Sequence, residues 1–366
     1  MKKKVVFILS SIQDSHQTNR VTEFVSEGYN VDVFAFNRKN VKSKNTNFSF
    51  EFRIIGEFDF HEPYRNRILK IYNAVKFIAS AYRNKSDVVF YYQGLSIAMF
   101  AAYMIKSPYI YEECDLLHVS LRNKLLRSIL DRIDKNVINR SLLTILTSKG
   151  FADYHFGDKV PSNIVFVTNR LQKSILDLPI FPPKELNINK LDLAFVGSMR
   201  YDSIYNFVKV YLENFPQHNF HLFGVMFHDK FRDFEKFPNF FNHGAFRNPD
   251  DLPEIYSKLD IVLCAYDSRG INERYAEPNK LYEAIFFEKP IIVSDGTFLA
   301  KEVRSMDIGY IIDALDDGRI ISFINSINVQ SIRAKQINAC KIDKESFCIN
   351  SNEFLFSKIN EIVYGS

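Results

Sequence analysis

The stretch EPNKLYEAIFFEKPIIVSDG, residues 277–296, decides the fold of the second half of the chain. Pro278 suits the first position of a helix, because the N–H that proline lacks would have no partner there. An amphipathic segment, 279–287, follows, and the apolar run PIIVSD (290–295) is predicted to be a buried strand. A helix that leads into a buried strand is typical of a parallel αβ sheet, and Glu283 is a lone carboxylate on that helix.

The same alternation of apolar runs and amphipathic segments extends in both directions. Strands are predicted at KVVFILS (4–10), NVDVFAF (30–36), 48–55, SDVVFYYQG (86–94), PYIYEE (108–113), SLLTILTS (141–148), LDLAFVG (191–197), NFHLFG (219–224), DIVLCAY (260–266) and GYIID (309–313). Helices are predicted between them, including basic ones at 65–83 and 121–139. The predicted fold class is α/β, with two doubly wound, Rossmann-like domains facing a central cleft.

A proline-rich stretch divides this pattern. Residues 171–190 include Pro179, Pro182 and Pro183 and are predicted to be a linker. An N-terminal domain of 1–170 would precede it, and a C-terminal domain of 191–343 would follow. Residues 344–366 are expected to form a C-terminal helix that packs back on the N-terminal domain.

Length and composition exclude several classes of protein. A chain of 366 residues suits two domains of ordinary size. The longest apolar run, 97–105, is far shorter than the roughly 20 residues needed to span a bilayer. Residues 5–9 are predicted to be a first strand rather than the core of a signal peptide. The four cysteines have neither zinc-site spacing nor a disulfide pattern, so a cytoplasmic location is expected.

The charge of the chain is unevenly distributed. Residues 1–170 carry 25 Lys and Arg against 16 Asp and Glu, a net +9, whereas the remainder carries 22 against 27, a net −5. The basic half favours an anionic partner, such as a membrane surface or a phosphate-bearing substrate, although ordinary surface lysines are the alternative. No nucleic-acid-binding signature is present. A dinucleotide-binding dehydrogenase is disfavoured, because SSIQDSH (10–16) stands where such an enzyme would have its glycine-rich turn.

Two candidate ligand-binding elements lie in the second half. Gly197 and Arg200 follow a predicted strand, where glycine permits close approach of the backbone and arginine can pair with a phosphate. The alternative is a surface turn with a solvated arginine.

The second element is the start of the predicted helix, Glu277 to Lys280, whose free N–H groups favour an anion. Asn279 is the first residue after the proline, Lys280 can add charge to a diphosphate, and Glu283 can accept hydrogen bonds from a ribose diol. Lys280 and Glu283 are three residues apart, so an ordinary Lys–Glu pair within the helix is the alternative.

The first half contains a dense set of candidates for proton transfer. YEECDLLH (111–118) follows a predicted strand and contains Glu112, Glu113, Asp115 and His118. A helix start with capping acids is the alternative. Three polar residues after the first strand can touch an acceptor or a phosphate: His16, Gln17 and Arg20.

Taken together, LDLAFVGSMRYDS, NFHLFG, AEPNKLYEAIFFEKPIIVSDG and IGYIID resemble the donor-binding domain of GT-B glycosyltransferases, with bacterial family 4 as the nearest match. The resemblance implies a nucleotide-diphosphate sugar, by default a UDP-sugar, in the C-terminal domain. It implies that Glu283 binds the ribose and that Gly197 and Arg200 lie near the diphosphate. It also implies that Asp115, and after it His118 and Glu113, act on the acceptor side. The resemblance implies no cofactor and no metal. It implies that the configuration of the sugar is retained.

Two positions depart from the family pattern. The usual acidic pair, spaced by eight, would require an acid where Tyr275 stands, and Glu277 is the nearest replacement. The lysine that often follows the arginine of the first turn is absent, because Lys209 is too distant. Lys280 is expected to supply that charge.

The resulting expectation is a peripheral-membrane glycosyltransferase that transfers a sugar to a surface-polysaccharide or lipid-linked glycan acceptor of the capsule or O-antigen type. The basic amphipathic helices 65–85 and 121–140 would touch the inner membrane face. Two alternatives remain: a nucleotide-sugar epimerase of similar fold, and a nucleotide-binding scaffold that has lost catalysis.

Overall fold

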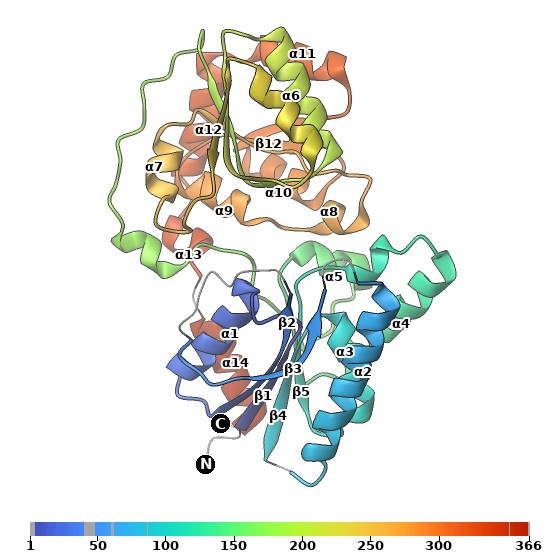
Figure 1. The fold of residues 1–366 in the computed structure, drawn as a ribbon. Coiled ribbons are helices and arrows are strands. Elements are labelled where there is room, and N and C mark those ends of the chain that lie inside the picture. Colours follow the sequence, from blue (N-terminus) through green and yellow to red (C-terminus); the bar gives the residue numbers. More distant parts are fainter. Residues whose placement is uncertain (1–3, 40–47, 60–61, 86, 351, 365–366) are drawn as a thin grey trace. The chain divides into compact units, whose positions relative to one another are not determined.

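The computed structural model describes residues 4–39, 48–59, 62–85, 87–350 and 352–364 (Figure 1). The chain divides into two compact units. Unit 1 comprises Met1–Val167 and Ser351–Ser366, and unit 2 comprises Thr168–Asn350. The chain therefore leaves unit 1 after its last strand and returns to it with its last helix.

Unit 1 is built on a parallel sheet whose described strands have the order β3-β2-β1-β4-β5-β6-β7. Its strands are β1 (Lys4–Leu9), β2 (Val31–Arg38), β3 (Arg53–Phe58), β4 (Val88–Gln93), β5 (Tyr109–Glu113), β6 (Leu143–Leu146) and β7 (Ile164–Phe166). Its helices are α1 (Ser15–Ser26), α2 (Tyr64–Ala81), α3 (Leu95–Met104), η1 (Leu117–Ser120), α4 (Lys124–Arg140), α5 (Lys149–Phe156) and α14 (Glu353–Tyr364).

The central strand β1 explains why helices cover both faces of this sheet. Side chains alternate between the two faces of a strand, and in β1 both sets are apolar. Val6 and Ile8 pack with α2, α3 and α4, whereas Phe7 and Leu9 pack with α1 and α14. A strand that is buried on both faces can carry chemistry only at its ends.

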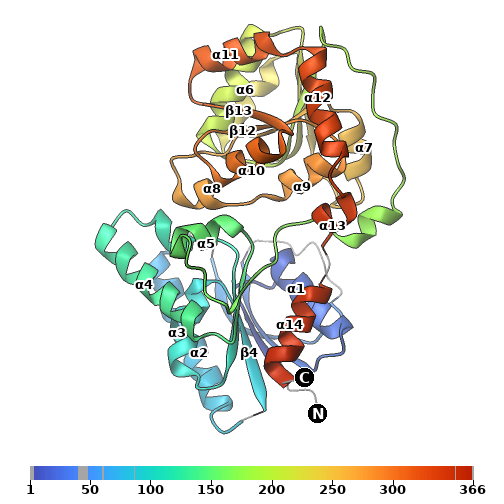
Figure 2. The ribbon, with the colours of Figure 1, turned by 180° about the vertical axis from the view of Figure 1, so that it is seen from behind.

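Helix α14 completes the core of unit 1 although it is far from the other elements in sequence. Figure 2 shows it lying beside α1. Phe356 packs edge-on against Phe24, with ring centres 5.0 Å apart, and Tyr29 donates a hydrogen bond to Asn360. Leu355 is buried in the same cluster.

Unit 2 has a second parallel sheet, with the described strands in the order β10-β9-β8-β11-β12-β13. Its strands are β8 (Asp192–Met199), β9 (Asn219–Met226), β10 (Phe240–Gly244), β11 (Ile261–Cys264), β12 (Ile291–Ser294) and β13 (Gly309–Ile312). Its helices are η2 (Lys173–Asp177), α6 (Asp202–Asn214), η3 (Asp229–Lys236), α7 (Leu252–Ser257), α8 (Ile271–Tyr275), α9 (Asn279–Phe286), α10 (Phe298–Met306), α11 (Asp317–Ser326), α12 (Val329–Cys340) and α13 (Lys344–Cys348).

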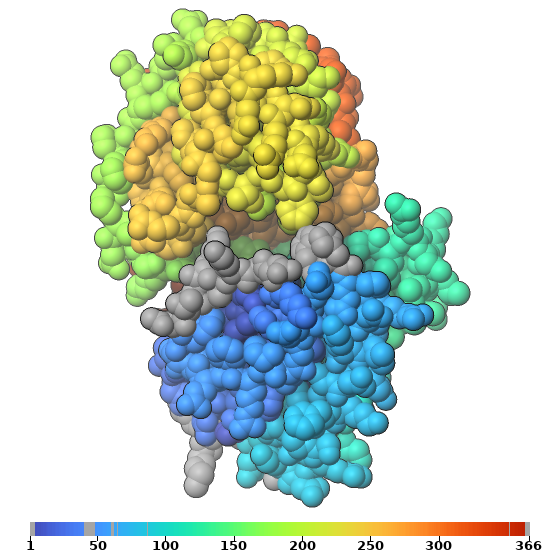
Figure 3. All heavy atoms as spheres, viewed as in Figure 1, coloured from blue at the N-terminus to red at the C-terminus, as the bar shows by residue number. Residues whose placement is uncertain are grey.

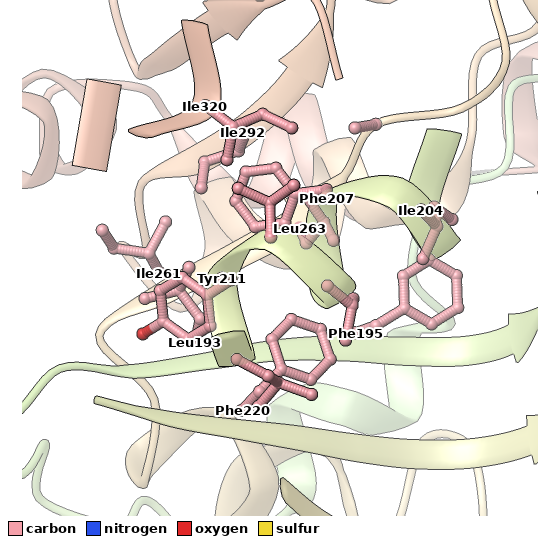
Figure 4. Close-up of a cluster of buried hydrophobic side chains, with 14 of the residues drawn as sticks. Leu193, Phe195, Ile204, Phe207, Tyr211, Phe220, Ile261, Leu263, Ile292 and Ile320 are labelled. Atoms are coloured by element: carbon pink, nitrogen blue, oxygen red, sulfur yellow. The ribbon is translucent and has the colours of Figure 1, made fainter. Parts of the chain in front are cut away.

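Helices also cover both faces of this second sheet. On one face Phe195 and Leu263 pack with Phe207 of α6 and Ile320 of α11 (Figure 4). The other face packs against α7, α9 and α10. The opening stretch of the sequence therefore contributes a helix, α9, and a strand, β12, to one closely packed layer.

Several predicted elements differ from those observed. The strand predicted at 48–55 begins at Arg53, because Phe48 packs its ring against Phe50 and Phe52 instead of pairing with β2. Residues 171–190 belong to unit 2. Within them Leu171 pairs with Ile349 in an isolated bridge. The single helix predicted at 344–366 is two, α13 in unit 2 and α14 in unit 1. In the described part of the chain, no helix has the length and hydropathy of a membrane span.

Two phenylalanines of α14 provide a matched test of its role in the core. Phe356 is 3% exposed and Phe354 is 59% exposed. Removal of a buried phenylalanine ring costs about 3–5 kcal/mol, so Phe356→Ala should lower the free energy of unfolding of unit 1 by that amount. Phe354→Ala should change it by about 0.5 kcal/mol or less. Urea denaturation measures both values, and equal losses would contradict the packing of α14 described above.

Candidate functional site

The strand order of unit 2 reverses at β8, which has β9 on one side and β11 on the other. In open αβ sheets, ligands bind at the carboxyl ends of the strands at such a reversal. Gly197 lies near this end of β8, opposite Gly224 of β9. A Cβ atom on Gly224 would lie 1.9 Å from the carbonyl oxygen of Gly197, and both residues have positive φ angles of 142° and 139°. Only glycine lets the two strands approach this closely.

Lys280, in the first turn of α9, fills the space beside Gly197. A Cβ atom on Gly197 would lie 3.0 Å from Lys280 Nζ. Lys280 is 6% exposed, and its ammonium group lies 5.8 Å from the ring centre of Phe195 and 3.5 Å from Asn279 Oδ1. Among the residues that the structure describes, no carboxylate forms an ion pair with it. A buried ammonium without a counter-charge thus lies at the glycine-lined end of β8.

The buried thiol of Cys264 is also close to the Lys280 ammonium. Cys264 ends β11, the strand next to β8. Burial raises the pKa of this thiol to about 12, and the Lys280 ammonium opposes that rise. The ammonium is therefore close to the carboxyl ends of both β8 and β11.

Glu283 lies one turn further along α9 and does not pair with Lys280. It is 1% exposed, and its two carboxylate oxygens accept hydrogen bonds from Tyr256 (2.6 Å) and from the Asn279 amide (2.7 Å). The predicted Lys–Glu pair is therefore not formed in the described structure. Each oxygen of a carboxylate can accept a second hydrogen bond, so capacity remains for a ligand hydroxyl.

Two other predicted donor-site residues, Glu277 and Arg200, have partners of their own. Glu277 accepts a hydrogen bond from the Tyr282 hydroxyl, whose oxygen lies 2.7 Å from Thr168 Oγ1. Tyr282 lies two residues after Lys280, on nearly the opposite side of the helix. Arg200 is exposed, and its guanidinium lies 5.0 Å from the ring centre of Tyr201.

A cavity of about 460 Å³ also lies in unit 2, lined by residues such as Leu178, Phe181 and Phe287. None of the predicted donor-site residues lines it. It is predominantly apolar, although Lys289 and Lys344 also line it.

Unit 1 has its own reversal of strand order, at β1, and a buried carboxylate beside it. Glu112 is fully buried and accepts hydrogen bonds from Tyr91 (2.7 Å), Gln93 (2.9 Å) and Arg20 (3.0 Å). His16 Nε2 lies 3.1 Å from the same carboxylate. Burial alone would raise the pKa of Glu112, but Arg20 and then His16 hold it well below its ordinary value.

His16 is the accessible member of this network, with 37% of its side chain exposed. It follows Asp14, which caps α1. The Cys114 thiol raises the pKa of His16 most, burial lowers it, and Glu112 raises it further, so the net pKa lies well above the ordinary value. The raised pKa favours the cationic form of the imidazole, which is a hydrogen-bond donor to anions.

The three predicted catalytic residues separate in the structure. Asp115 is exposed, whereas Glu113 and His118 are buried. Glu113 Oε2 lies 2.9 Å from His155 Nε2, and burial raises its pKa to about 8. His118 Nδ1 lies 3.4 Å from Asp134 Oδ2. Glu113 and His118 thus face the interior of unit 1, and only Asp115 can meet a substrate.

Sequence reasoning missed several members of these sites. Gly224 could have been found from its place at the end of a predicted strand next to that of Gly197. The partners of the buried acids, Tyr256, Asp134 and His155, carry no local signal because they come from elements distant in sequence.

No protein-family model matches the chain. Over 120 residues, 31% of its length, the chain is 28% identical to the succinoglycan biosynthesis protein ExoL of Rhizobium meliloti (strain 1021). The match spans only 30% of that relative.

Solved structures are similar over nearly the whole chain. Sucrose-phosphate synthase from Thermosynechococcus elongatus aligns with a TM-score of 0.69, 12% identity and 98% of both chains covered. HepE from Anabaena in complex with UDP aligns with a TM-score of 0.68 and 12% identity. The alignment covers 99% of this chain and 100% of HepE. The lipopolysaccharide outer core galactosyltransferase WaaB aligns with a TM-score of 0.62 and 14% identity, and the alignment covers 99% of both chains. The chain has the GT-B fold, as predicted from the sequence, with two Rossmann-like parallel-sheet domains; membership of family 4 stays a prediction.

The His16–Glu112 pair predicts how stability depends on pH. Because the pKa of His16 is raised in the folded protein, the histidine adds to the free energy of unfolding. This stabilisation is complete below 6.5, the pKa in the unfolded chain, and is lost as pH rises through the folded pKa. Because the pKa of Glu112 is lowered in the folded protein, its stabilisation is present above 4.5, the pKa in the unfolded chain, and is lost as pH falls through the folded pKa. Wild type should therefore be more stable than His16→Gln near about pH 6, and the difference should shrink as pH rises.

Thermal unfolding of wild type and His16→Gln across this range measures the difference. His228→Gln, which changes an exposed histidine of unit 2, is the control and should differ little from wild type at any pH. A wild-type advantage over His16→Gln that stays constant with pH would contradict the assignment of His16 as a cation.

Proposed function

We propose that this protein is a glycosyltransferase that transfers a sugar from a nucleotide-diphosphate sugar, by default a UDP-sugar, to a surface-polysaccharide or lipid-linked glycan acceptor. The nucleotide diphosphate binds in unit 2, at the carboxyl ends of β8 and β11. Transfer proceeds with retention of configuration, and the residues described here supply positive charge for it without a metal ion.

The observation that carries this proposal is the buried Lys280 ammonium without a carboxylate partner. Leaving a buried charge unpaired is costly, so a site of this kind favours a ligand that brings the missing negative charge. The absence of a side chain at Gly197 lets the ammonium lie at the carboxyl end of β8, where a ligand of such a sheet binds. A diphosphate supplies both the charge and several acceptor oxygens.

The comparisons support the choice of ligand. The similar HepE structures contain UDP, UDP with glucose, or UDP-glucose. The partial relative ExoL is a succinoglycan biosynthesis protein, which supports a polysaccharide acceptor.

In the proposed reaction, the bond between the sugar and the diphosphate breaks while the acceptor hydroxyl forms the new bond. Lys280 and the free N–H groups of α9 stabilise the negative charge that develops on the leaving diphosphate, with Arg200 supplying further charge. Glu283 accepts a hydrogen bond from the ribose. In unit 1, Asp115 is proposed to take the acceptor proton, and the His16 imidazolium to bind an anionic group of the acceptor.

Replacing Lys280 tests the donor site. Lys280→Met keeps the apolar stem and removes the charge, so affinity for UDP should fall about ten- to hundredfold, the worth of one hydrogen bond to a charged group. Gly197→Ala should weaken UDP binding too, because its Cβ would displace the ammonium. Isothermal titration calorimetry with UDP measures both, with Lys209→Met, an exposed lysine of α6, as the control.

Undiminished binding to Lys280→Met would overturn the donor site. If nucleotide binds but neither transfer nor hydrolysis of the UDP-sugar occurs, the protein is a scaffold, a function that the lack of an acid at Tyr275 favours. Interconversion of the donor sugar without an acceptor would identify an epimerase. The anomeric configuration of the product, read by NMR, checks retention.

We further propose that unit 1 meets the membrane through the first half of α4. Leu125 is 72% exposed, and Leu126 and Ile129 are exposed beside it. Lys124 precedes them and Arg127 lies among them. Figure 3 shows this part of the chain, coloured teal, projecting from the rest of unit 1. Exposed apolar side chains among basic ones suit the surface of an anionic bilayer.

Vesicle flotation with phosphatidylglycerol-containing liposomes tests this contact. Leu125→Asp combined with Ile129→Asp should weaken binding about tenfold or more, because two apolar side chains no longer enter the bilayer. Ile180→Asp, at an exposed apolar position of unit 2, should leave binding unchanged. Equal binding of all three proteins would argue against a membrane contact at α4.

A further inference from the structure

Five polar residues of unit 1 converge in its interior, apart from the sites described above for ligands. Glu113 ends β5, and His118 lies in η1. Asp131 and Asp134 lie on α4, and His155 lies on α5. One ligand atom each from Glu113, Asp134 and His155 lies within 4.8 Å of the others. The side chains of Glu113, His118, Asp134 and His155 are at most 1% exposed.

The hydrogen bonding of this cluster is incomplete. Six of its buried atoms have no hydrogen-bond partner among the described residues: Glu113 Oε1, His118 Nδ1 and Nε2, Asp131 Oδ1, Asp134 Oδ2 and His155 Nδ1. Buried polar groups are nearly always satisfied, and each orphan costs about 1–3 kcal/mol. Four of these atoms face one another in two pairs, His118 Nδ1 with Asp134 Oδ2 and His118 Nε2 with Asp131 Oδ1, and an additional bound group would satisfy the set.

The composition of the cluster indicates what that is. It has three carboxylates and two imidazoles, and among the described residues Lys135 forms an ion pair with it, 3.2 Å from Asp131. Lone pairs directed inward and an excess of negative charge suit a cation rather than an anion or an apolar group. Imidazole nitrogen together with carboxylate oxygen is a donor set that suits zinc among the divalent ions.

The distances agree with a four-coordinate ion. Two ligands, each about 2.1 Å from a tetrahedral ion, lie about 3.4 Å from each other. His118 Nδ1 lies 3.4 Å from Asp134 Oδ2, and His155 Nε2 lies 2.9 Å from Glu113 Oε2. Glu113, Asp134 and His155 can therefore meet at one ion, and His118, whose Nδ1 lies beside Asp134, would complete the set after a change of its side-chain torsions.

The neighbouring groups also match those of a metal site. Ligating histidines usually donate their second N–H to a carboxylate, and ligating carboxylates usually accept a hydrogen bond. His118 Nε2 lies 3.6 Å from Asp131 Oδ1, and Tyr111 donates to Asp134 Oδ1 (2.9 Å). Asp131 and Tyr111 would thus orient a histidine ligand and a carboxylate ligand.

We propose that Glu113, His118, Asp134 and His155 bind one Zn²⁺ ion, with Asp131 positioning His118. Four protein ligands leave no open position, so the site is structural rather than catalytic. It fastens the end of β5, η1, α4 and α5 to one another, and so holds the loop that carries Asp115. The proposal is independent of the function proposed for unit 2.

The full-length chain, purified without chelators, tests the proposal. Elemental analysis should find one zinc per chain. EDTA should lower the unfolding temperature, and added Zn²⁺ should restore it. After exchange with Co²⁺, the protein should show the intense visible absorption of a tetrahedral Co²⁺ site.

Matched variants locate the ion. His118→Gln and His155→Gln should each weaken Zn²⁺ binding about tenfold or more, and Asp131→Asn about ten- to hundredfold. His16→Gln should retain the ion. It is the critical control because His16, Glu112 and Cys114 form a second group of potential ligands in unit 1.

Two results would overturn the proposal. In the first, the wild-type chain holds no zinc, and neither EDTA nor Zn²⁺ changes its unfolding temperature. A proton shared between Glu113 and Asp134 would then satisfy the cluster. In the second, His16→Gln loses the ion while His118→Gln keeps it, which would assign the ion to the other group. If the variants do not fold, the metal content and Co²⁺ spectrum of the wild type decide.

Discussion

Helices cover both faces of each parallel sheet, and this constraint determines where the chain can carry chemistry. Every strand near the middle of a sheet is apolar on both sides, so charged groups can reach a ligand only beyond strand ends. In unit 2 the reversal at β8 brings Gly197 and Lys280 together there. In unit 1 the reversal at β1 does the same for His16 and Glu112. Both sites follow from strand order rather than from a continuous motif.

The two units bury charge in different ways. Glu112 is surrounded by donors and has a cation on each side, so its charge is fully compensated within the protein. In the described part of the chain, Lys280 lies near an amide oxygen at 3.5 Å, an aromatic ring and the Cys264 thiol, and no carboxylate forms an ion pair with it. A compensated charge stabilises the fold by itself, whereas an uncompensated one gains most of its partners when a ligand arrives.

The sequence predicted the GT-B fold and most of the strands, because strands buried on both faces are continuous apolar runs between turn residues. It also predicted that Gly197 and Lys280 share a site. It did not separate Glu112 from Glu113, although neighbours on a strand point to opposite faces, so one of them had to face away from any shared site. The packing of a C-terminal helix on the N-terminal unit was predicted and is confirmed by α14. The hydrogen bond between Glu277 and Tyr282 could not be found, since it depends on packing that local periodicity does not encode.

The return of the chain to unit 1 for α14 has a consequence for its synthesis. Residues 168–350 form a complete unit and leave the ribosome before α14 does. The core around Phe24 and Tyr29 lacks the rings and aliphatic side chains of α14 until then. Domains generally fold as units in the order of synthesis, so unit 2 can reach its native state while unit 1, which begins first, finishes last. During that interval the apolar surface beside α1 is open to chaperones and to other nascent chains.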